Sequence, residues 1–143
     1  MIHEGTHYER ISHAVYKYRA LVDIYTQTRI KGYDISTNYI RLMPCGNLIT
    51  KKGYACDGAS GPTIDDNSNM HGAFAHDGLF QLLRLGKLGY QKDEFDKNRK
   101  LADKTLIDQC KKDGMPWIRR QLWYYSLRMF GKKNALPRGD VYN

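Results

Sequence analysis

The chain has few of the residues that hold small secreted proteins together. Its 143 residues include three cysteines, Cys45, Cys56 and Cys110, at long spacings and without a CxxC pair. This pattern argues against a disulfide framework and against a zinc site built from cysteines. We therefore expect free thiols in a reducing compartment, with Cys110 buried in the core rather than reactive.

Long apolar runs are also missing. No stretch approaches the roughly 20 consecutive apolar residues that a membrane-spanning helix needs. The polar N-terminus, Met1–Ser12, has no basic segment followed by an apolar one, so no signal peptide is expected. The sequence, which has neither repeats nor low-complexity segments, predicts a soluble protein without a transmembrane segment.

Acidic residues are outnumbered by basic ones. The 15 Asp and Glu residues stand against 23 Lys and Arg, which gives a net charge of +8 at pH 7. Such an excess favours phosphate-bearing partners, either anionic lipid or nucleic acid, although it can also serve solubility alone. Nucleic acid is the less favoured partner, because no helix-turn-helix, zinc-finger or RNP motif is present.

The first 56 residues have the pattern of a small antiparallel sheet. Short runs rich in β-formers, with alternating apolar and polar positions, are separated by turn residues. The predicted strands are 15–19, 22–26, 39–42 and 48–50, and turn residues lie at 31–34 and 44–47. Residues 57–68 follow as a loop rich in glycine and Asp or Asn, whose carbonyl groups can turn inward.

The rest of the chain reads as helical, which makes the fold class α+β. Apolar periodicity and end signals predict three helices, 69–85, 93–112 and one from Pro116 to Gly131. We expect a single domain over 1–131, with the sheet followed by three helices and the first two helices antiparallel. The polar tail, 132–143, is expected to lie outside this domain.

His76, Asp77 and Asp103 are the residues with the most informative placement. Neighbouring helical side chains point about 100° apart, so His76 and Asp77 face different partners. If the first two helices pack antiparallel, Asp103 can meet His76, fix its tautomer and stabilise the imidazolium that forms when the other nitrogen takes a proton. His76 would then be a general base for water.

Asp77 would face the loop that carries Asp57. Two carboxylates with backbone oxygens suit Ca²⁺, and the set lacks the His and Cys ligands that zinc prefers. Each residue also has an ordinary explanation. Asp57 can be a turn former, Asp103 a solvated helix residue or a partner of Arg99, and small residues around His76 can reflect close helix packing.

Three motifs in fixed order carry a resemblance. They resemble an uncharacterised family common in bacteriophage genomes. The motifs are Gly53-Tyr-Ala-Cys-Asp57-Gly-Ala-Ser60-Gly-Pro62, His76-Asp77-Gly-Leu-Phe80 and Arg99-Lys-Leu-Ala-Asp103. That family has the signatures G(F/Y)xTDxASxP, HDxLY and RxxAD. The resemblance spans roughly residues 40–131 and implies a viral protein of the host cytoplasm or the virion.

The same skeleton is similar to prokaryotic phospholipase A2, including an apolar-basic-apolar-Phe-Gly run at residues 127–131. The similarity implies a phospholipase A2-like helical core. It implies His76 as base, Asp103 as its orienting acid, and Asp57, the Gly58 carbonyl and Asp77 as Ca²⁺ ligands. Ser60 and Arg99 would support the site.

Several positions depart from these families. Cys56 replaces a threonine before Asp57, and Ala73 stands where secreted phospholipases have a loop-tethering cysteine. Gly78 and Phe80 replace aromatic residues that usually carry a hydroxyl. A hydrogen bond that supports the site is therefore expected to be missing, and the identity of the substrate stays open.

The sequence thus favours a Ca²⁺-assisted hydrolase that cleaves a phospholipid ester, with Trp117, Trp123 and Tyr124 as candidate membrane anchors. The alternative is a phage-encoded, non-enzymatic binding protein that acts on a host factor, in counter-defence or as a virion accessory. A nucleic-acid-binding protein is a third interpretation, supported by charge alone.

Overall fold

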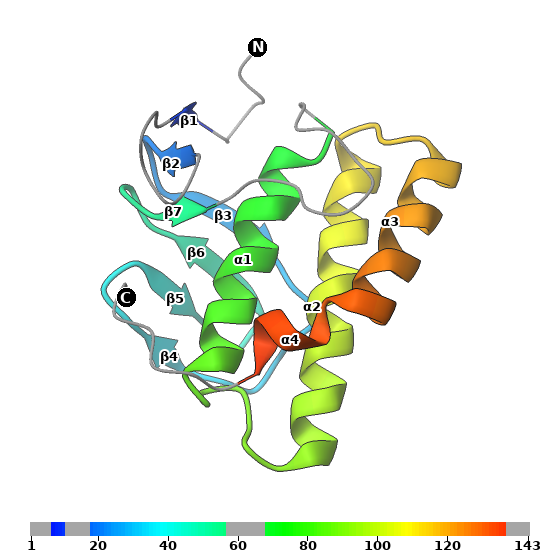
Figure 1. Ribbon diagram of the computed structural model, residues 1–143. Helices are drawn as coiled ribbons and strands as arrows, with labels where there is room; N and C mark the ends of the chain where they lie inside the picture. The colour runs from blue at the N-terminus through cyan, green and yellow to red at the C-terminus, as the bar shows by residue number, and fades with distance from the viewer. Residues whose placement is uncertain (1–6, 11–17, 57–67, 137–143) are drawn as a thin grey trace.

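Two small antiparallel sheets precede the helices in the computed structural model, which describes residues 7–10, 18–56 and 68–136 (Figure 1). The first sheet has the order β1-β2-β7, and the second has the order β3-β6-β5-β4. The strands are β1 (Tyr8–Arg10), β2 (Tyr18–Ala20), β3 (Ile24–Gln27), β4 (Ile35–Ser36), β5 (Ile40–Leu42), β6 (Asn47–Thr50) and β7 (Ala55–Cys56).

The sequence predicted the antiparallel pairing but not the division into two sheets. Strands β1, β4 and β7 were not expected, because two or three residues are too few to show an alternating pattern. The chain changes sheets at Leu21–Asp23, where Leu21 and Val22 are exposed and the Asp23 carboxylate accepts a hydrogen bond from the Lys52 backbone amide. Of the predicted strand 15–19, residues 15–17 lie outside the described part of the chain.

Three helices follow at almost the predicted positions. They are α1 (Met70–Arg84), α2 (Lys92–Lys112) and α3 (Trp117–Phe130). A short fourth helix, α4 (Lys132–Ala135), occupies the start of the segment that was expected to be a polar tail. Ala135 is fully buried, and α4 packs against α1, so this part of the expectation was wrong. A four-residue helix with one apolar residue shows no periodicity that the sequence could reveal.

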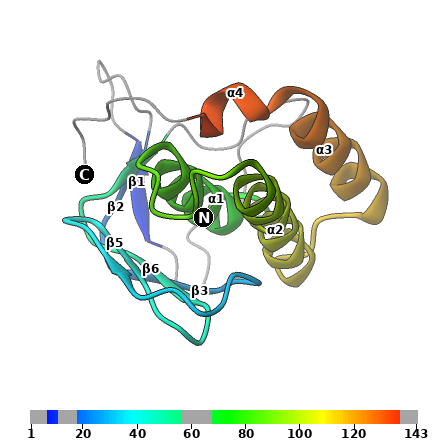
Figure 2. The same ribbon diagram turned by 90° about the horizontal axis from the view of Figure 1, so that it is seen from below.

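Helix α1 is the centre of the molecule. All of its residues except Asp77 and Arg84 are buried, as expected for a helix enclosed on every side. Both views place α1 between the four-stranded sheet and α2 (Figures 1 and 2). Its first turn is fixed to β3 by His71, whose Nε2 lies 3.0 Å from the Tyr25 carbonyl oxygen and 2.9 Å from Thr26 Oγ1.

Small residues let α1 approach its neighbours closely. A Cβ atom on Gly72 would lie 2.7 Å from Leu106 Cδ1 and 3.1 Å from the Leu106 carbonyl oxygen, and one on Gly78 would lie 3.1 Å from Thr50 Cγ2. Gly78 therefore allows α1 to pack closely against the sheet. This agrees with the ordinary explanation given for the small residues around His76. Helices α1 and α2 run antiparallel, as predicted, and α3 runs antiparallel to α2 on its other side (Figure 1).

The cysteines agree with a further expectation. Cys45, Cys56 and Cys110 are free thiols, and Cys110 is buried between α2 and α3 with Leu106, Met115, Trp123 and Leu127. Among the residues that the structure describes, no helix combines the length and the apolar character needed to cross a bilayer.

The close contact at Gly72 generates the first prediction. Gly72→Ala should lower the free energy of unfolding by about 1 kcal/mol. Overpacking of a filled core costs about 1 to 3 kcal/mol, because the Leu106 carbonyl is part of the backbone of α2, and the helix-propensity gain of about 1 kcal/mol offsets part of this cost. Urea denaturation followed by circular dichroism measures this difference. A variant as stable as the wild type would contradict the close approach of α1 and α2.

Candidate functional site

A buried carboxylate, that of Asp103, lies where three helices meet. Asp103 is in the middle of α2 and is 0% exposed. Its Oδ1 lies 2.7 Å from Nε2 of His76 on α1, and its Oδ2 accepts a hydrogen bond of 2.8 Å from Nη1 of Arg128 on α3. One side chain therefore receives a polar contact from each neighbouring helix.

Two arginines surround Asp103 unequally. Arg128 donates a direct hydrogen bond, whereas Nη1 of Arg99 lies 3.9 Å from Oδ2 and contributes attraction without a hydrogen bond. Arginine remains charged throughout the accessible pH range, so Oδ2 of Asp103 faces a permanent positive charge. The ordinary explanation of Asp103 as a solvated helix residue does not apply, because Asp103 is fully buried, and the arginine hydrogen-bonded to it is Arg128 rather than Arg99.

Arg99 has a different task. Its guanidinium donates to the carbonyl oxygens of Leu127 and Arg128, each at 3.3 Å, which fixes the last turn of α3 to α2. Burial lowers the pKa of Arg99, the neighbouring Arg128 lowers this pKa further, and Asp103 opposes both effects. Its Nε has no hydrogen-bond partner among the described residues. Arg99 thus positions the backbone from which Arg128 reaches Asp103.

His76 is held by its charge partner and by an aromatic ring. The ring of Phe80, one turn later on α1, lies 4.1 Å from the imidazole between centroids, at an interplanar angle of 37°. An ionised carboxylate can only accept, so Nε2 of His76 carries the hydrogen of the contact with Asp103. The other ring nitrogen, Nδ1, has no hydrogen bond to any described residue and is the atom left to take a proton.

The sequence therefore placed His76 and Asp103 correctly next to each other, while their catalytic role stays a prediction. It missed Arg128, which lies 25 residues after Asp103 and was noted only within the apolar-basic-apolar run. Phe80, whose ring contacts His76, has no hydroxyl group that could support Asp103. In this protein, the guanidinium of Arg128 supplies the second polar contact to the Asp103 carboxylate.

The predicted Ca²⁺ ligands are described only in part. Asp57, Gly58 and Ser60 lie outside the described residues, so the structure places only Asp77 of this set. Asp77 is partly buried and follows His76 directly on α1, and β7, which ends at Cys56, packs against the same helix. In the described segments, no group of three or more His, Cys, Asp or Glu residues is arranged to hold a metal ion. Oxygen donors such as Asp77 fit Ca²⁺ in chemistry, and the Ca²⁺ site stays a prediction.

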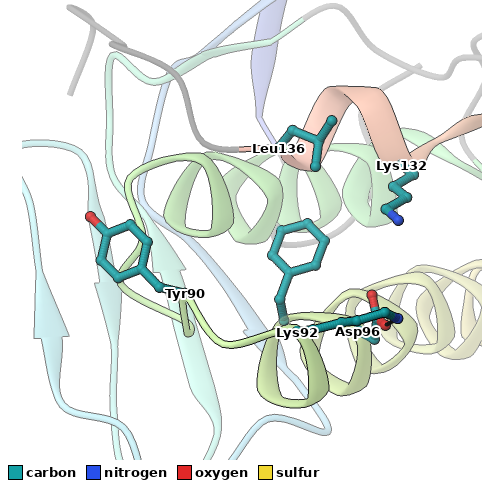
Figure 3. A pocket seen from close by; sticks show the side chains of 6 residues that line it. Tyr90, Lys92, Asp96, Lys132 and Leu136 are labelled. Carbon is teal, nitrogen blue, oxygen red and sulfur yellow. Dashed lines mark hydrogen bonds and ion pairs between the residues drawn. The ribbon is translucent and has the colours of Figure 1, made fainter.

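A cavity of about 220 Å³ lies apart from the His76–Asp103 contact (Figure 3). It lies between the start of α2 and α4, and it contains none of the predicted site residues. Its lining consists of Tyr90, Lys92, Phe95, Asp96, Lys132 and Leu136. Asp96 is about two helical turns before Asp103, so the cavity lies about 10 Å along α2 from the buried carboxylate.

Comparison with known proteins gives no further assignment. No protein-family model, no curated protein and no solved structure matches this chain. The functional argument therefore depends on the geometry around Asp103.

The burial of Asp103 generates the second prediction. Asp103→Ala should lower the free energy of unfolding by about 3 to 5 kcal/mol, because it leaves Arg128 and His76 without their buried partner. Asp108→Ala is the matched control on the same helix. Its ion pair with Arg29 is about half exposed and should contribute less than about 1 kcal/mol. Equal losses in the two variants, measured by chemical denaturation, would contradict the buried cluster.

Proposed function

We propose that the protein is a Ca²⁺-assisted hydrolase that cleaves an ester bond of an anionic glycerophospholipid, with His76 as general base and Asp103 as its orienting acid. The observation that supports this most directly is the 2.7 Å contact between His76 Nε2 and Asp103 Oδ1, with Arg128 on the other carboxylate oxygen. A carboxylate held from both sides keeps the imidazole in one orientation and one tautomer.

In this proposal, His76 and Asp103 provide the proton transfers that ester hydrolysis requires. Nδ1 of His76 takes a proton from water, and the water oxygen attacks the ester carbonyl carbon. The imidazolium is stabilised by Asp103, to which Nε2 donates throughout. When the ester C–O bond breaks, Nδ1 returns the proton to the leaving alkoxide, so a carboxylic acid and an alcohol result. General-base catalysis of this kind typically supplies about 10²- to 10⁴-fold in rate.

In this proposal, Asp57, the Gly58 carbonyl and Asp77 hold the Ca²⁺ ion. When bound, the ion supplies positive charge that stabilises the carbonyl oxygen as water attacks. Asp77 is the neighbour of His76 in the chain, so one turn of α1 serves both the ion and the base. Ser60 supports the loop, and Arg99 supports the base indirectly through the last turn of α3.

The net charge of the chain supports the choice of an anionic phospholipid as substrate. The chain carries a net charge of +8, which favours surfaces with negative phosphate groups. Anionic glycerophospholipid offers both the phosphate and an ester, whereas nucleic acid has no carboxylic ester. Phosphatidylglycerol is therefore the first substrate to test.

A second function is favoured by the burial of the same cluster. His76 is only 6% exposed, and its contact with Asp103 and Arg128 also joins three helices. A phage-encoded binding protein that acts on a host factor, in counter-defence or as a virion accessory, would keep this cluster for stability alone. In that case, His76 would matter for folding and not for any reaction.

The third prediction separates the two functions. The wild-type protein, incubated with phosphatidylglycerol vesicles and Ca²⁺, should release free fatty acid that mass spectrometry detects, and a chelator should abolish the release. His76→Ala should reduce the rate by about 10²- to 10⁴-fold because the base is lost. Asp108→Asn, a substitution at an exposed ion pair on α2, is the control that should keep full activity.

Folding must be measured for each variant by circular dichroism and thermal melting. Absence of fatty acid from the folded wild type, or full activity of folded His76→Ala, would reject the hydrolase. The binding-protein interpretation would then replace it.

A further inference from the structure

Helix α3 has apolar residues on two opposite sides. Trp123 and Leu127 face inward and are buried against α2. Ile118, Leu122, Tyr125 and Met129 are spaced four, three and four residues apart, which places them on one stripe of the helix. Their exposed fractions are 67%, 60%, 60% and 72%, so this stripe, here called the outer face of α3, points away from the core.

The outer face lies at the edge of the molecule. Both views show α3 at the side of α2 remote from the sheets (Figures 1 and 2). Trp117 and Phe130, at the two ends of α3, are also exposed, at 63% and 67%. The prediction of Trp123 as a membrane anchor was wrong, because this residue lies in the core and is only 2% exposed. Trp117 remains a candidate anchor. A helix side that faces water is normally polar, so this apolar stripe indicates a partner.

The charges along the chain segment that contains α3 are almost all positive. Between residues 111 and 136, the chain has seven Lys and Arg residues and a single acid, Asp113, so this segment carries six of the eight net positive charges. Exposed lysine pairs stand at both ends of the helix, Lys111–Lys112 before it and Lys132–Lys133 after it. α3 itself contains three arginines and no acidic residue.

This combination selects among possible partners. A second copy of the chain would place the same face against itself under two-fold symmetry, and the lysine pairs and arginines would then repel each other. Anionic lipid has the complementary chemistry. Its acyl boundary accepts the outer face, and its phosphate groups accept the lysines, whose long stems reach outward.

We propose that the outer face of α3 is a membrane-contact surface that lies flat on an anionic bilayer. This contact does not depend on the proposed hydrolase activity, because it uses residues outside the His76–Asp103 pair. The two are nevertheless adjacent. Since α3 also supplies Arg128 to Asp103, the bilayer would lie about one helix diameter, roughly 10 Å, from the buried cluster.

The test uses vesicles of ether-linked phosphatidylglycerol, which has no ester to cleave. The wild type should sediment with these vesicles without added Ca²⁺ and should stay in solution with ether-linked phosphatidylcholine. Emission of Trp117 should shift to shorter wavelength on binding. Trp123, the other tryptophan of the chain, is already buried and should not contribute to the shift.

Two sets of variants separate the apolar and the charged contributions. Ile118→Ser/Leu122→Ser/Met129→Ser should weaken partitioning about 100-fold or more, because three large side chains no longer enter the lipid. Its control, Leu21→Ser/Val22→Ser/Tyr25→Ser, changes three exposed apolar residues in or next to β3 and should bind like the wild type.

Substitution of Lys111, Lys112, Lys132 and Lys133 by Gln should weaken binding by on the order of fivefold per lysine. The control replaces the same number of exposed lysines elsewhere, Lys31, Lys52, Lys87 and Lys97. It keeps the same total charge and should bind more tightly than the first set.

Several outcomes of these experiments would overturn the membrane-contact proposal. No sedimentation of the wild type, equal loss in the test and control variants, or full binding by the folded triple serine variant would overturn it. So would a wild-type dimer in analytical ultracentrifugation that the triple serine variant converts to monomer. Binding without fatty acid release from ester lipid would support the membrane contact while rejecting the hydrolase.

Discussion

The ion pairing of Asp103 is the interaction on which the rest of the structure depends. A carboxylate removed from water costs several kcal/mol unless it is fully paired. Here the pairing requires α1 to deliver His76 and α3 to deliver Arg128 at the same point of α2. The glycine at position 72 permits α1 to come close enough, and Arg99 holds the end of α3 in place. The arrangement of the three helices and the orientation of His76 therefore have one common cause.

Two buried histidines on α1 show what this pairing adds. His71 contacts a backbone carbonyl oxygen and a threonine hydroxyl on β3, which are neutral groups that join the helix to the sheet. His76 contacts a charged carboxylate, which stabilises the protonated imidazole whenever Nδ1 takes a proton. Among the contacts described for these two histidines, the one with a carboxylate, which is a partner suited to proton transfer, belongs to His76.

The helices and the His76–Asp103 contact could be predicted from the sequence, because a strong apolar periodicity and a short connection force α1 and α2 into an antiparallel pair. The role of Arg128 could not be predicted from the sequence, since it depends on how α3 packs against α2. The split into two sheets and helix α4 rest on segments of two to four residues, too short for any period to appear. The residues at 57, 58 and 60 lie outside the described part of the chain, so the Ca²⁺ ligands stay predicted. The outer face of α3 has the same periodicity as a core face, and only the structure shows which apolar side meets water.

The central claim is that Asp103 fixes His76 with its proton on Nε2 and leaves Nδ1 free to act as a base. The most direct test is the side-chain tautomer of His76, read from ¹⁵N chemical shifts and long-range ¹⁵N–¹H correlations at mildly alkaline pH, with His76→Gln used to assign the signals. The account predicts a protonated Nε2 and an unprotonated Nδ1, and loss of this preference in Asp103→Ala if that variant remains folded. A proton on Nδ1 in the wild type, or a mixture of the two tautomers, would contradict it.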